Sequence, residues 1–518
     1  MSGRADRLLA GTAEPGSLLR ALHAQVSAAP QRPALHSPGR TISYGKLWRR
    51  VERVCAHLCG SWGVRPGDRV ATLCLNHDLQ LAMLFACARL GAIFVPLNFR
   101  LAVPELSAIA AHAGIRVLLH DAPHAAAAAA VAAAAMQEPA AHAPIESLID
   151  RPAPRGARLP APSRPADEAP LLLAYTSGST GQPKGALHTQ AGVLANARAS
   201  WWAHGMTRDD HILSVLPLFH VGGLCIQTLP ALLAGAQVTL HQRFAPDGWL
   251  QALAQTRATL SLMVPATLRA VLEHPGWPGA DLSSLRGVMA GSSPIPRAYI
   301  DAFHARGIPL GQVYGATETG PVSVVLRLDQ AMARPGYAGW PQPEVAVRLA
   351  SADGAEVPDG EVGELWLAGA NLMQGYWRQP DHPDFRDGWF HSGDLAHRNA
   401  DGCIEVVGRS KDMIISGGEN IYPAEIENVL LGLPGVQDCA VVGLPDVHWG
   451  EVPVAVVVPA AGADLRALAQ EPLREALAGH IARFKLPRRV VLLDSLPKSA
   501  LGKVLKPQLR AMLEMSSG

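Results

Sequence analysis

Short apolar runs alternate with helical patterns through the first 290 residues. Val70–Leu75 and Ala92–Pro96 are continuous apolar runs typical of buried strands, and Gln80–Leu90 between them has a helical pattern. A strand, a helix and a strand at this spacing predict a parallel α/β layer. A further helical pattern runs from Arg40 to about Gly60. Further buried strands are predicted at residues 171–175, 213–216, 237–240, 260–264 and 287–290.

The stretch between His120 and Pro170 has a different composition. It is alanine-rich over residues 125–135 and then becomes rich in proline. This predicts a helix followed by an irregular connector, with a disordered linker as the alternative.

The pattern changes again near Gly408. Tyr422-Pro423 starts a helix with proline in its first turn. Residues 441–443 and 452–458 resemble a strand pair, and a helical pattern follows from 465 to about 483. We therefore expect an α/β fold with a large N-terminal domain of layered sheets (1–408), a connection at 409–412, and a small α+β C-terminal domain (413–518).

The composition of the chain limits the number of domains, the kinds of binding partner and the compartment that can be expected. The chain has 518 residues, 48% of them hydrophobic, which predicts more than one domain with ample cores. A net charge of +1 gives no reason to expect nucleic acid or an anionic membrane surface. There is no apolar run of 18 residues and no signal-peptide core. The seven scattered cysteines favour a reducing cytoplasm over disulfides or a metal site.

The segment 175–186, which directly follows an apolar run, carries the strongest chemical signal. Its glycines can turn successive backbone N–H groups toward one anion, its hydroxyls add donors, and Lys184 adds a positive charge. Such a loop is suited to a polyphosphate, although it is not a Walker A loop, because Pro183 stands where the second glycine should be. The alternative is a Ser/Gly surface turn. The candidate ligands are Thr176, Ser177, Gly178, Ser179, Thr180, Gly181 and Lys184.

This order of residues resembles the phosphate loop of the adenylate-forming enzymes, which include acyl-CoA synthetases, peptide-synthetase adenylation domains and luciferases. The resemblance implies that a carboxylate is activated with ATP, that pyrophosphate is released, and that the acyl group passes to a thiol. ATP, Mg²⁺ and coenzyme A would then be the cofactors and cosubstrates.

Further motifs match the family in the same order along the chain. In the stretch 312–320, Tyr314 offers a flat face for a purine, Thr317 a hydroxyl for phosphate and Glu318 a hard oxygen ligand for Mg²⁺. Asp394 matches the ribose-binding aspartate and Arg409 a second ribose contact. The resemblance adds nucleotide contacts at Gly291, Ser292, Ser293, Gly315 and Ala316.

The resemblance also assigns roles in the C-terminal part. Lys411 would be the hinge of a mobile C-terminal domain, and Gly417 and Gly418 would border the channel for the pantetheine arm of CoA. Lys503 follows Gly502 and would be the catalytic lysine, whose charge relieves the repulsion between the carboxylate and the α-phosphate. The chain departs from the usual pattern at Leu501, where a small or hydroxylated residue is common.

The segment 217–224 is the candidate acyl site, with His220 near the reacting acyl group; a capping or core histidine is the alternative. Val221 keeps the wall apolar, while Gly222 and Gly223 remove side-chain volume, as a long chain or a ring would require. The segment has no Arg or Lys, which makes a dicarboxylate such as malonate a less suitable substrate.

Together these motifs predict a cytoplasmic, ATP-dependent, AMP-forming acid–CoA ligase for a fatty or aromatic monocarboxylic acid. Residues 94–100 and 411–423 look most like bacterial fatty-acyl-CoA and feruloyl-CoA synthetases. The partners are small molecules. Three alternatives remain: a free-standing adenylation domain that loads a carrier protein, a luciferase-type oxygenase, and a nucleotide-binding relic without activity.

Overall fold

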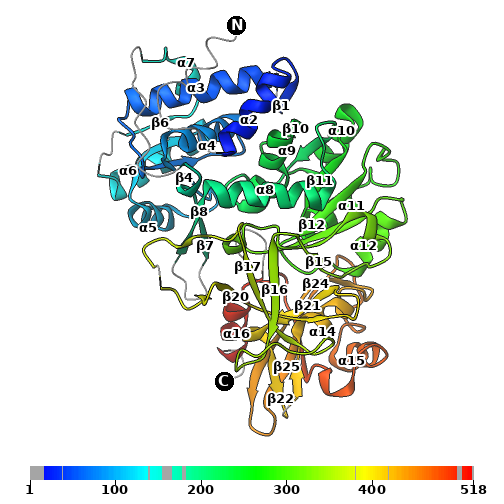
Figure 1. Cartoon of the computed structure of the whole chain (residues 1–518). Coiled ribbons are helices and arrows are strands. Elements are labelled where there is room, and N and C mark those ends of the chain that lie inside the picture. The colour runs from blue at the N-terminus through cyan, green and yellow to red at the C-terminus, as the bar shows by residue number, and fades with distance from the viewer. Residues whose placement is uncertain are drawn as a thin grey trace.

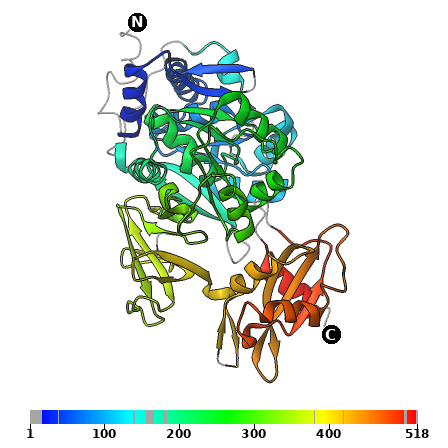
Figure 2. The ribbon, with the colours of Figure 1, turned by 90° about the vertical axis from the view of Figure 1, so that its right-hand side faces the viewer.

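The computed structural model describes residues 17–37, 39–137, 141–154, 166–177, 183–379, 381–417, 419–498 and 504–515. The blue to green elements form a large upper part, and the orange and red elements form a separate lower lobe (Figure 1). A yellow group of strands lies beside that lobe, beneath the large part (Figure 2). Within the described ranges, no helix has the length and apolar character needed to cross a bilayer.

A nine-stranded, largely parallel sheet forms one half of the large part, in the order β15-β14-β13-β12-β11-β9-β10-β1-β2. Its strands are β1 (Pro33–Ser37), β2 (Arg40–Ser43), β9 (His211–Ser214), β10 (Gln237–Leu240), β11 (Leu260–Met263), β12 (Gly287–Gly291), β13 (Leu310–Tyr314), β14 (Val324–Leu326) and β15 (Trp340–Pro341). The strands from β1 to β13 along this order pair in parallel, and β2, β14 and β15 add antiparallel edges.

A seven-stranded sheet forms the other half, in the order β18-β8-β7-β4-β3-β5-β6. Its strands are β3 (Arg69–Leu73), β4 (Ile93–Pro96), β5 (Ile115–His120), β6 (His142–Pro144), β7 (Pro170–Ser177), β8 (Pro183–Thr189) and β18 (Gly375–Tyr376). The parallel pairing of β3 with β4 around a helix confirms the predicted α/β layer.

Helices lie between the two sheets and on both outer faces, so the large part is layered as expected from its apolar runs. The inner helices share one core with strands of both sheets: α2 (Ser17–Ala28), α3 (Tyr44–Gly60), α4 (Asp78–Leu90), α8 (Gln190–His204) and α9 (Leu229–Ala234). The outer helices pack on the far faces: α10 (Pro246–Thr256), α11 (Pro265–Leu272) and α12 (Arg297–His304) on the first sheet, and α5 (Val103–Ala113) and α6 (Ala125–Ala135) on the second. Two short helices complete this part: α7 (Ser147–Asp150) and α13 (Leu328–Ala331).

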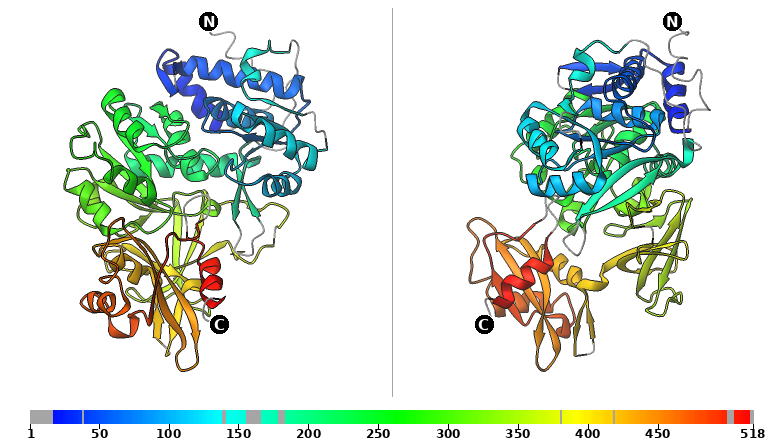
Figure 3. Two further views of the ribbon diagram at one scale, coloured as in Figure 1. Left: turned by 180° about the vertical axis from the view of Figure 1, so that it is seen from behind. Right: turned by 90° about the vertical axis from the view of Figure 1, so that its left-hand side faces the viewer.

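The strands after β15, apart from β18, form two five-stranded sheets. The first contains β16 (Val345–Ala350), β17 (Gly363–Gly369), β19 (Phe385–Arg386), β20 (Trp389–Arg398) and β21 (Ile404–Arg409). The second contains β22 (Ile414–Ser416), β23 (Glu419–Ile421), β24 (Val436–Asp446), β25 (Gly450–Pro459) and β26 (Arg489–Leu492). One face of the second sheet is covered by α14 (Pro423–Leu430) and α15 (Gln470–Ala478), and the other by α16 (Lys506–Met515), which is red in Figure 3.

Several boundaries differ from the sequence expectations for local reasons. Residues 40–43 form β2 and not the start of a helix, because Ser43 accepts a hydrogen bond from the Lys46 N–H and so caps α3. Helix α15 begins at Gln470 rather than 465, which leaves Pro472 in the first turn, where its missing N–H needs no partner. The alanine-rich helix is confirmed as α6, but the connector after it contains β6 and α7.

Residues 410–412 connect the two C-terminal sheets. They form a short 3₁₀ turn (η6, Ser410–Asp412) between β21 and β22. The division into domains at 409–412 remains a prediction, and this change of sheet is consistent with it.

Candidate functional site

The phosphate-loop candidate lies between two antiparallel strands. Strands β7 and β8 pair so that Thr176 stands opposite Lys184. The candidates Gly178, Ser179, Thr180 and Gly181 lie outside the described residues. The hairpin therefore presents a threonine and a partly buried lysine (side chain 17% exposed) side by side at the base of the loop.

Thr317 and Glu318 lie in a short 3₁₀ turn (η5, Thr317–Thr319) after β13. Gly315 allows the turn, because a Cβ there would lie 2.3 Å from the carbonyl oxygen of Pro321. Thr317 is buried, and the Tyr376 hydroxyl donates a hydrogen bond of 2.8 Å to Oε1 of Glu318. Burial and the nearby carboxylate raise the pKa of Tyr376, so the phenol keeps its proton and remains the donor.

The arrangement around Glu318 fits Mg²⁺ arriving with the nucleotide. Its second oxygen, Oε2, has no hydrogen-bond partner among the described residues. Within the same ranges there is no group of three or more His, Cys, Asp or Glu side chains that could hold an ion on their own. Mg²⁺ is usually bound by one or two carboxylates together with substrate phosphates, so a single carboxylate beside the phosphate hairpin is a suitable protein ligand.

Asp394, Arg409 and Tyr314 form one cluster. The Tyr314 hydroxyl donates to Oδ2 of Asp394 at 2.6 Å, and Nε of Arg409 lies 2.7 Å from Oδ1. Asp394 and Arg409 are also paired across β20 and β21. A carboxylate has about four lone-pair sites, so two remain for further donors, such as the two hydroxyls of a ribose.

Gly291 and Ser292 lie next to Tyr314, because β12 and β13 are neighbouring parallel strands that end together. Gly291 is in register with Val313, and a Cβ on Gly291 would lie 2.3 Å from the Val313 carbonyl oxygen. Ser292 has a left-handed backbone with φ 78°. The carboxyl edge of a parallel sheet is a usual place for a nucleotide, and the predicted adenine contacts lie at this edge.

The acyl-site candidate leads from β9 into a π-helix (η4, Gly222–Thr228), a rare element that is frequent at functional sites. Burial lowers the pKa of His220 to about 4, so its ring is neutral. Its Nδ1 accepts a hydrogen bond from the Gly222 N–H at 3.0 Å, which leaves Nε2 as the protonated, donating nitrogen. At Gly223 a Cβ would lie 2.2 Å from the Pro217 carbonyl oxygen, so the close backbone approach itself requires glycine.

Asn76, from the turn between β3 and α4, holds this segment in place. Its side-chain amide donates to the carbonyl oxygens of Leu216 and His241, both at 2.9 Å, and its oxygen accepts from the Leu218 N–H at 2.7 Å. The stretch that carries His220 is therefore fixed by two hydrogen bonds to one buried side chain, at Leu216 and Leu218, and the third bond ties the same side chain to His241.

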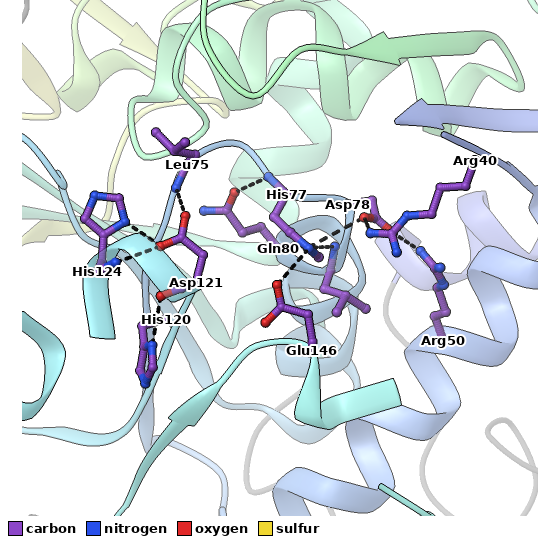
Figure 4. A network of polar contacts seen from close by, with 11 residues as sticks. Arg40, Arg50, Leu75, His77, Asp78, Gln80, His120, Asp121, His124 and Glu146 are labelled. Carbon is purple, nitrogen blue, oxygen red and sulfur yellow. Dashed lines mark hydrogen bonds and ion pairs between the residues drawn. The ribbon is translucent and has the colours of Figure 1, made fainter. Parts of the chain in front are cut away.

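A network of charged groups supports the turn that carries Asn76 (Figure 4). The Leu75 N–H donates to Oδ2 of Asp121 at 2.9 Å, just before Asn76. On the other side, Asp78 is buried and forms ion pairs with Arg40 and Arg50. Because these contacts fix both flanks of the turn, we assign the network a structural role.

A small cavity of about 10 Å³, the room of one water molecule, lies behind the acyl segment. Val221 and Cys225 line it from one side and Gly320 and Pro321 from the other. His188 also lines it, and its Nε2 has no hydrogen-bond partner among the described residues. The cavity thus joins the acyl segment to the turn that follows Glu318.

A sequence profile of the AMP-binding enzyme family matches residues 22–377, and one of the AMP-binding enzyme C-terminal domain matches residues 425–503. The chain belongs to the AMP-binding enzyme family.

Relatives with the same architecture are acid–CoA ligases. The chain is 44% identical to an indoleacetate–CoA ligase from Aromatoleum aromaticum, over 93% of this chain and 96% of that protein. It is also 44% identical to a feruloyl-CoA synthase from an Amycolatopsis species, with the same coverage. The solved o-succinylbenzoate CoA synthetase from Bacillus subtilis, in complex with its acyl-adenylate intermediate, superimposes with a TM-score of 0.85 at 30% identity, over 95% of this chain and 97% of that one.

These relatives confirm that the chain is an AMP-forming acyl-CoA synthetase of the adenylate-forming superfamily. They also confirm a fold with a large N-terminal and a small C-terminal domain, and the use of ATP, Mg²⁺ and CoA in the reaction. The roles of the individual residues remain predictions.

In this AMP-binding enzyme the C-terminal candidates are only partly described. Lys411 lies in η6, and Gly417, with φ 61°, makes the turn between β22 and β23. Its N–H donates to the Trp449 carbonyl oxygen at 2.8 Å. Gly418 and Lys503 lie outside the described residues.

The sequence motifs missed four residues near the predicted site. Asn76 fixes the acyl segment, and Tyr376, His382 and Asp384 surround Glu318 and Lys184. All four lie outside the motifs that carried the resemblance. Their only signal in the sequence is a polar residue within a turn or after a short apolar run.

Proposed function

We propose that this AMP-binding enzyme ligates an aromatic monocarboxylic acid to coenzyme A through an acyl-adenylate. The observation that carries the proposal is the Tyr314–Asp394–Arg409 cluster. It leaves two acceptor sites for a ribose beside a strand edge, one short turn from Thr317 and Glu318. The choice of an aromatic acid is supported by the relatives, which are named for indoleacetate and ferulate at 44% identity.

The reaction has two displacement steps. A carboxylate oxygen of the acid attacks the α-phosphorus of ATP, the bond to the bridging oxygen breaks, and pyrophosphate leaves. The CoA thiol then releases its proton to solvent and its sulfur attacks the acyl carbonyl carbon, and AMP leaves as the carbon–oxygen bond breaks. When bound with ATP, Mg²⁺ neutralises part of the phosphate charge, and Glu318 would be its ligand.

The side chains of this enzyme would bind and orient the reactants. Lys184 would hold the outer phosphates and Asp394 the ribose. The donating Nε2 of neutral His220 would form a hydrogen bond to an acyl oxygen, a role that does not require a protonated ring. Lys503 would bring its charge to the developing anion during adenylation.

The acid and the acyl acceptor can be tested together. Pyrophosphate release should depend on ATP and acid, and a panel of indoleacetate, ferulate, cinnamate, benzoate and C2 to C18 fatty acids should give the highest kcat/KM with an aromatic acid. Addition of CoA should convert the adenylate to a thioester. A preference for an aliphatic chain would refute the aromatic assignment, and release of pyrophosphate without thioester formation would favour a carrier-protein acceptor.

A cytoplasmic location is part of the same proposal. Both ATP and CoA are cytoplasmic cosubstrates. The seven cysteines are all free thiols, six of them buried, as expected of a protein in a reducing compartment.

A further inference from the structure

A second segment of the chain brings three side chains to Lys184. Strand β18 pairs antiparallel with β8, so that Tyr376 stands opposite Ala186. The chain then places Nε2 of His382 at 2.9 Å and Oδ2 of Asp384 at 3.9 Å from the Lys184 ammonium. The ammonium also lies 5.2 Å from the centre of the Tyr376 ring, within the range of a cation–π contact.

The charge of the lysine determines the state of the His382 ring. An ammonium can only donate, so Nε2 must accept, and the ring must be neutral with its proton on Nδ1. The carboxylate of Asp384 lies 3.5 Å from Nδ1 and attracts that proton. The backbone N–H of Asp384, 3.2 Å from the same Nδ1, would favour the other tautomer. In that tautomer, however, the N–H on Nε2 would face the N–H groups of the Lys184 ammonium, two donors with no acceptor between them. The 2.9 Å contact with Lys184 therefore favours the tautomer with its proton on Nδ1.

The environment of the ring agrees with a neutral imidazole. Burial lowers the pKa of His382, and the positive charge of Lys184 lowers it further, against the opposing effect of Asp384 and Glu318. The ring also packs edge-on against Tyr376, with centroids 4.6 Å apart. His382 is therefore held on two sides while its acceptor nitrogen points to the lysine.

We propose that His382, oriented by Asp384, is a positioning residue for Lys184 that holds the ammonium toward the outer phosphates of ATP. The inference rests on the proposed function, in which Lys184 binds those phosphates. A free lysine side chain loses rotamer entropy when it is fixed. A lysine already held by a neutral acceptor has lost part of that freedom and still keeps its full charge and two further N–H donors for phosphate.

The test compares nucleotides with and without the outer phosphates. In calorimetric titrations without acid, His382→Leu should weaken ATP binding about tenfold and leave AMP binding within twofold of the unsubstituted enzyme. His382→Gln, whose amide oxygen can replace Nε2 as acceptor, should stay within about threefold for ATP. The loss of ATP affinity in Asp384→Asn should lie between the losses in His382→Gln and His382→Leu. Asp381 is an exposed neighbour in the same segment, so Asp381→Asn should change the dissociation constant of neither ATP nor AMP.

A double-mutant cycle separates positioning from a general structural effect. In a Lys184→Ala background, His382→Leu should have no additional effect on ATP binding, because the group it positions is absent. Equal weakening of ATP and AMP, full additivity with Lys184→Ala, or a His382→Gln variant as poor as His382→Leu would overturn the proposal. Because these titrations need no turnover, they remain decisive even if the acid panel shows no ligase activity, an outcome that would count against the proposed function alone.

Discussion

Replacing Asp394 by asparagine tests the central contact of the proposed nucleotide site. Asp394 is buried, with its side chain 11% exposed, and its carboxylate accepts from Tyr314 and Arg409, which leaves two acceptor sites for ribose hydroxyls. In Asp394→Asn one acceptor oxygen becomes an NH₂ donor, which would face either Arg409, a donor only, or Tyr314, whose hydroxyl would then have to turn from donating to accepting. The negative charge that strengthens every bond in the cluster is lost as well.

The magnitude follows from the two ribose bonds. A hydrogen bond to a charged group contributes about 1.5–3 kcal/mol, and its neutral counterpart about 1 kcal/mol. In Asp394→Asn both ribose hydrogen bonds lose their charged acceptor, and one of them loses its acceptor altogether. The binding free energy of the nucleotide should therefore weaken by about 3 kcal/mol, which is roughly a 100-fold rise in its dissociation constant. The lost ion pair should affect folding less, because the Arg409 side chain is 34% exposed and water can solvate it.

The assay is calorimetric titration of AMP and of ATP. Both nucleotides carry the ribose, so both should weaken about equally, unlike the selective loss of ATP expected for His382→Leu. Tyr314→Phe, which removes one donor and keeps the carboxylate, should cost less than tenfold. Asp401→Asn, which disrupts an ion pair with the half-exposed Arg334, is the matched control and should leave both constants unchanged. An Asp394→Asn enzyme that binds AMP within threefold of the unsubstituted enzyme would refute the assignment of Asp394 to the ribose.

Four further predictions concern other parts of the enzyme. Lys503→Ala should slow acyl-AMP formation about a thousandfold, because a charge pair near 4 Å is worth about 4 kcal/mol at an effective dielectric of about 20. The same variant should form the thioester from synthetic acyl-AMP at the normal rate. Equal loss of both half-reactions would contradict the proposed role of Lys503. Glu318→Gln should raise the Mg²⁺ concentration for half-maximal activity, and an unchanged Mg²⁺ dependence would remove Glu318 from the metal site. Lys411→Pro should leave pyrophosphate release near normal and reduce thioester production at least about tenfold, because proline fixes φ at the proposed hinge; full ligase turnover would show that the hinge is elsewhere. Burial lowers the pKa of His204 from 6.5 to about 4, so between these values the unfolded chain binds a proton that the folded chain does not. The free energy of unfolding should therefore fall as pH drops from 6.5 toward 4, by at most about 1.4 kcal/mol per pH unit for this group, and His204→Gln should remove that slope from the urea-unfolding profile; an unchanged slope would show that the folded state protonates His204.

Local patterns predicted the elements whose formation depends on neighbouring residues. The alanine-rich stretch is α6, at the expected bounds, and the apolar run 171–175 lies within β7, which continues to Ser177 and so includes two residues that were expected in the loop. In these cases the residues that determine the structure lie within a few positions of each other, so the sequence contains the whole signal.

Contacts between distant segments could not be predicted in this way. His382 meets Lys184 only because β18 adds to the edge of β8, almost 200 residues earlier in the chain. Asn76 lies in an ordinary strand-to-helix turn, and its role depends on the backbone of Leu216 and Leu218 in the other half of the domain. Gly223 had a pattern-based explanation, room for the substrate, whereas the structure gives a steric reason in the carbonyl oxygen of Pro217.

The Tyr314–Asp394–Arg409 cluster is also relevant to how the C-terminal domain would move. Arg409, the last residue of β21, is held by Asp394, and Lys411 follows two residues later in η6. A bound nucleotide would add contacts to this cluster and fix the chain on the N-terminal side of the turn. A rotation at Lys411 would then move only the segment from about Met413 onward. Nucleotide binding and domain rotation would share one short segment, so Arg409→Gln should weaken AMP binding and also slow thioester formation from bound acyl-AMP. A variant that alters only one of the two would show that the ribose contact and the hinge act independently.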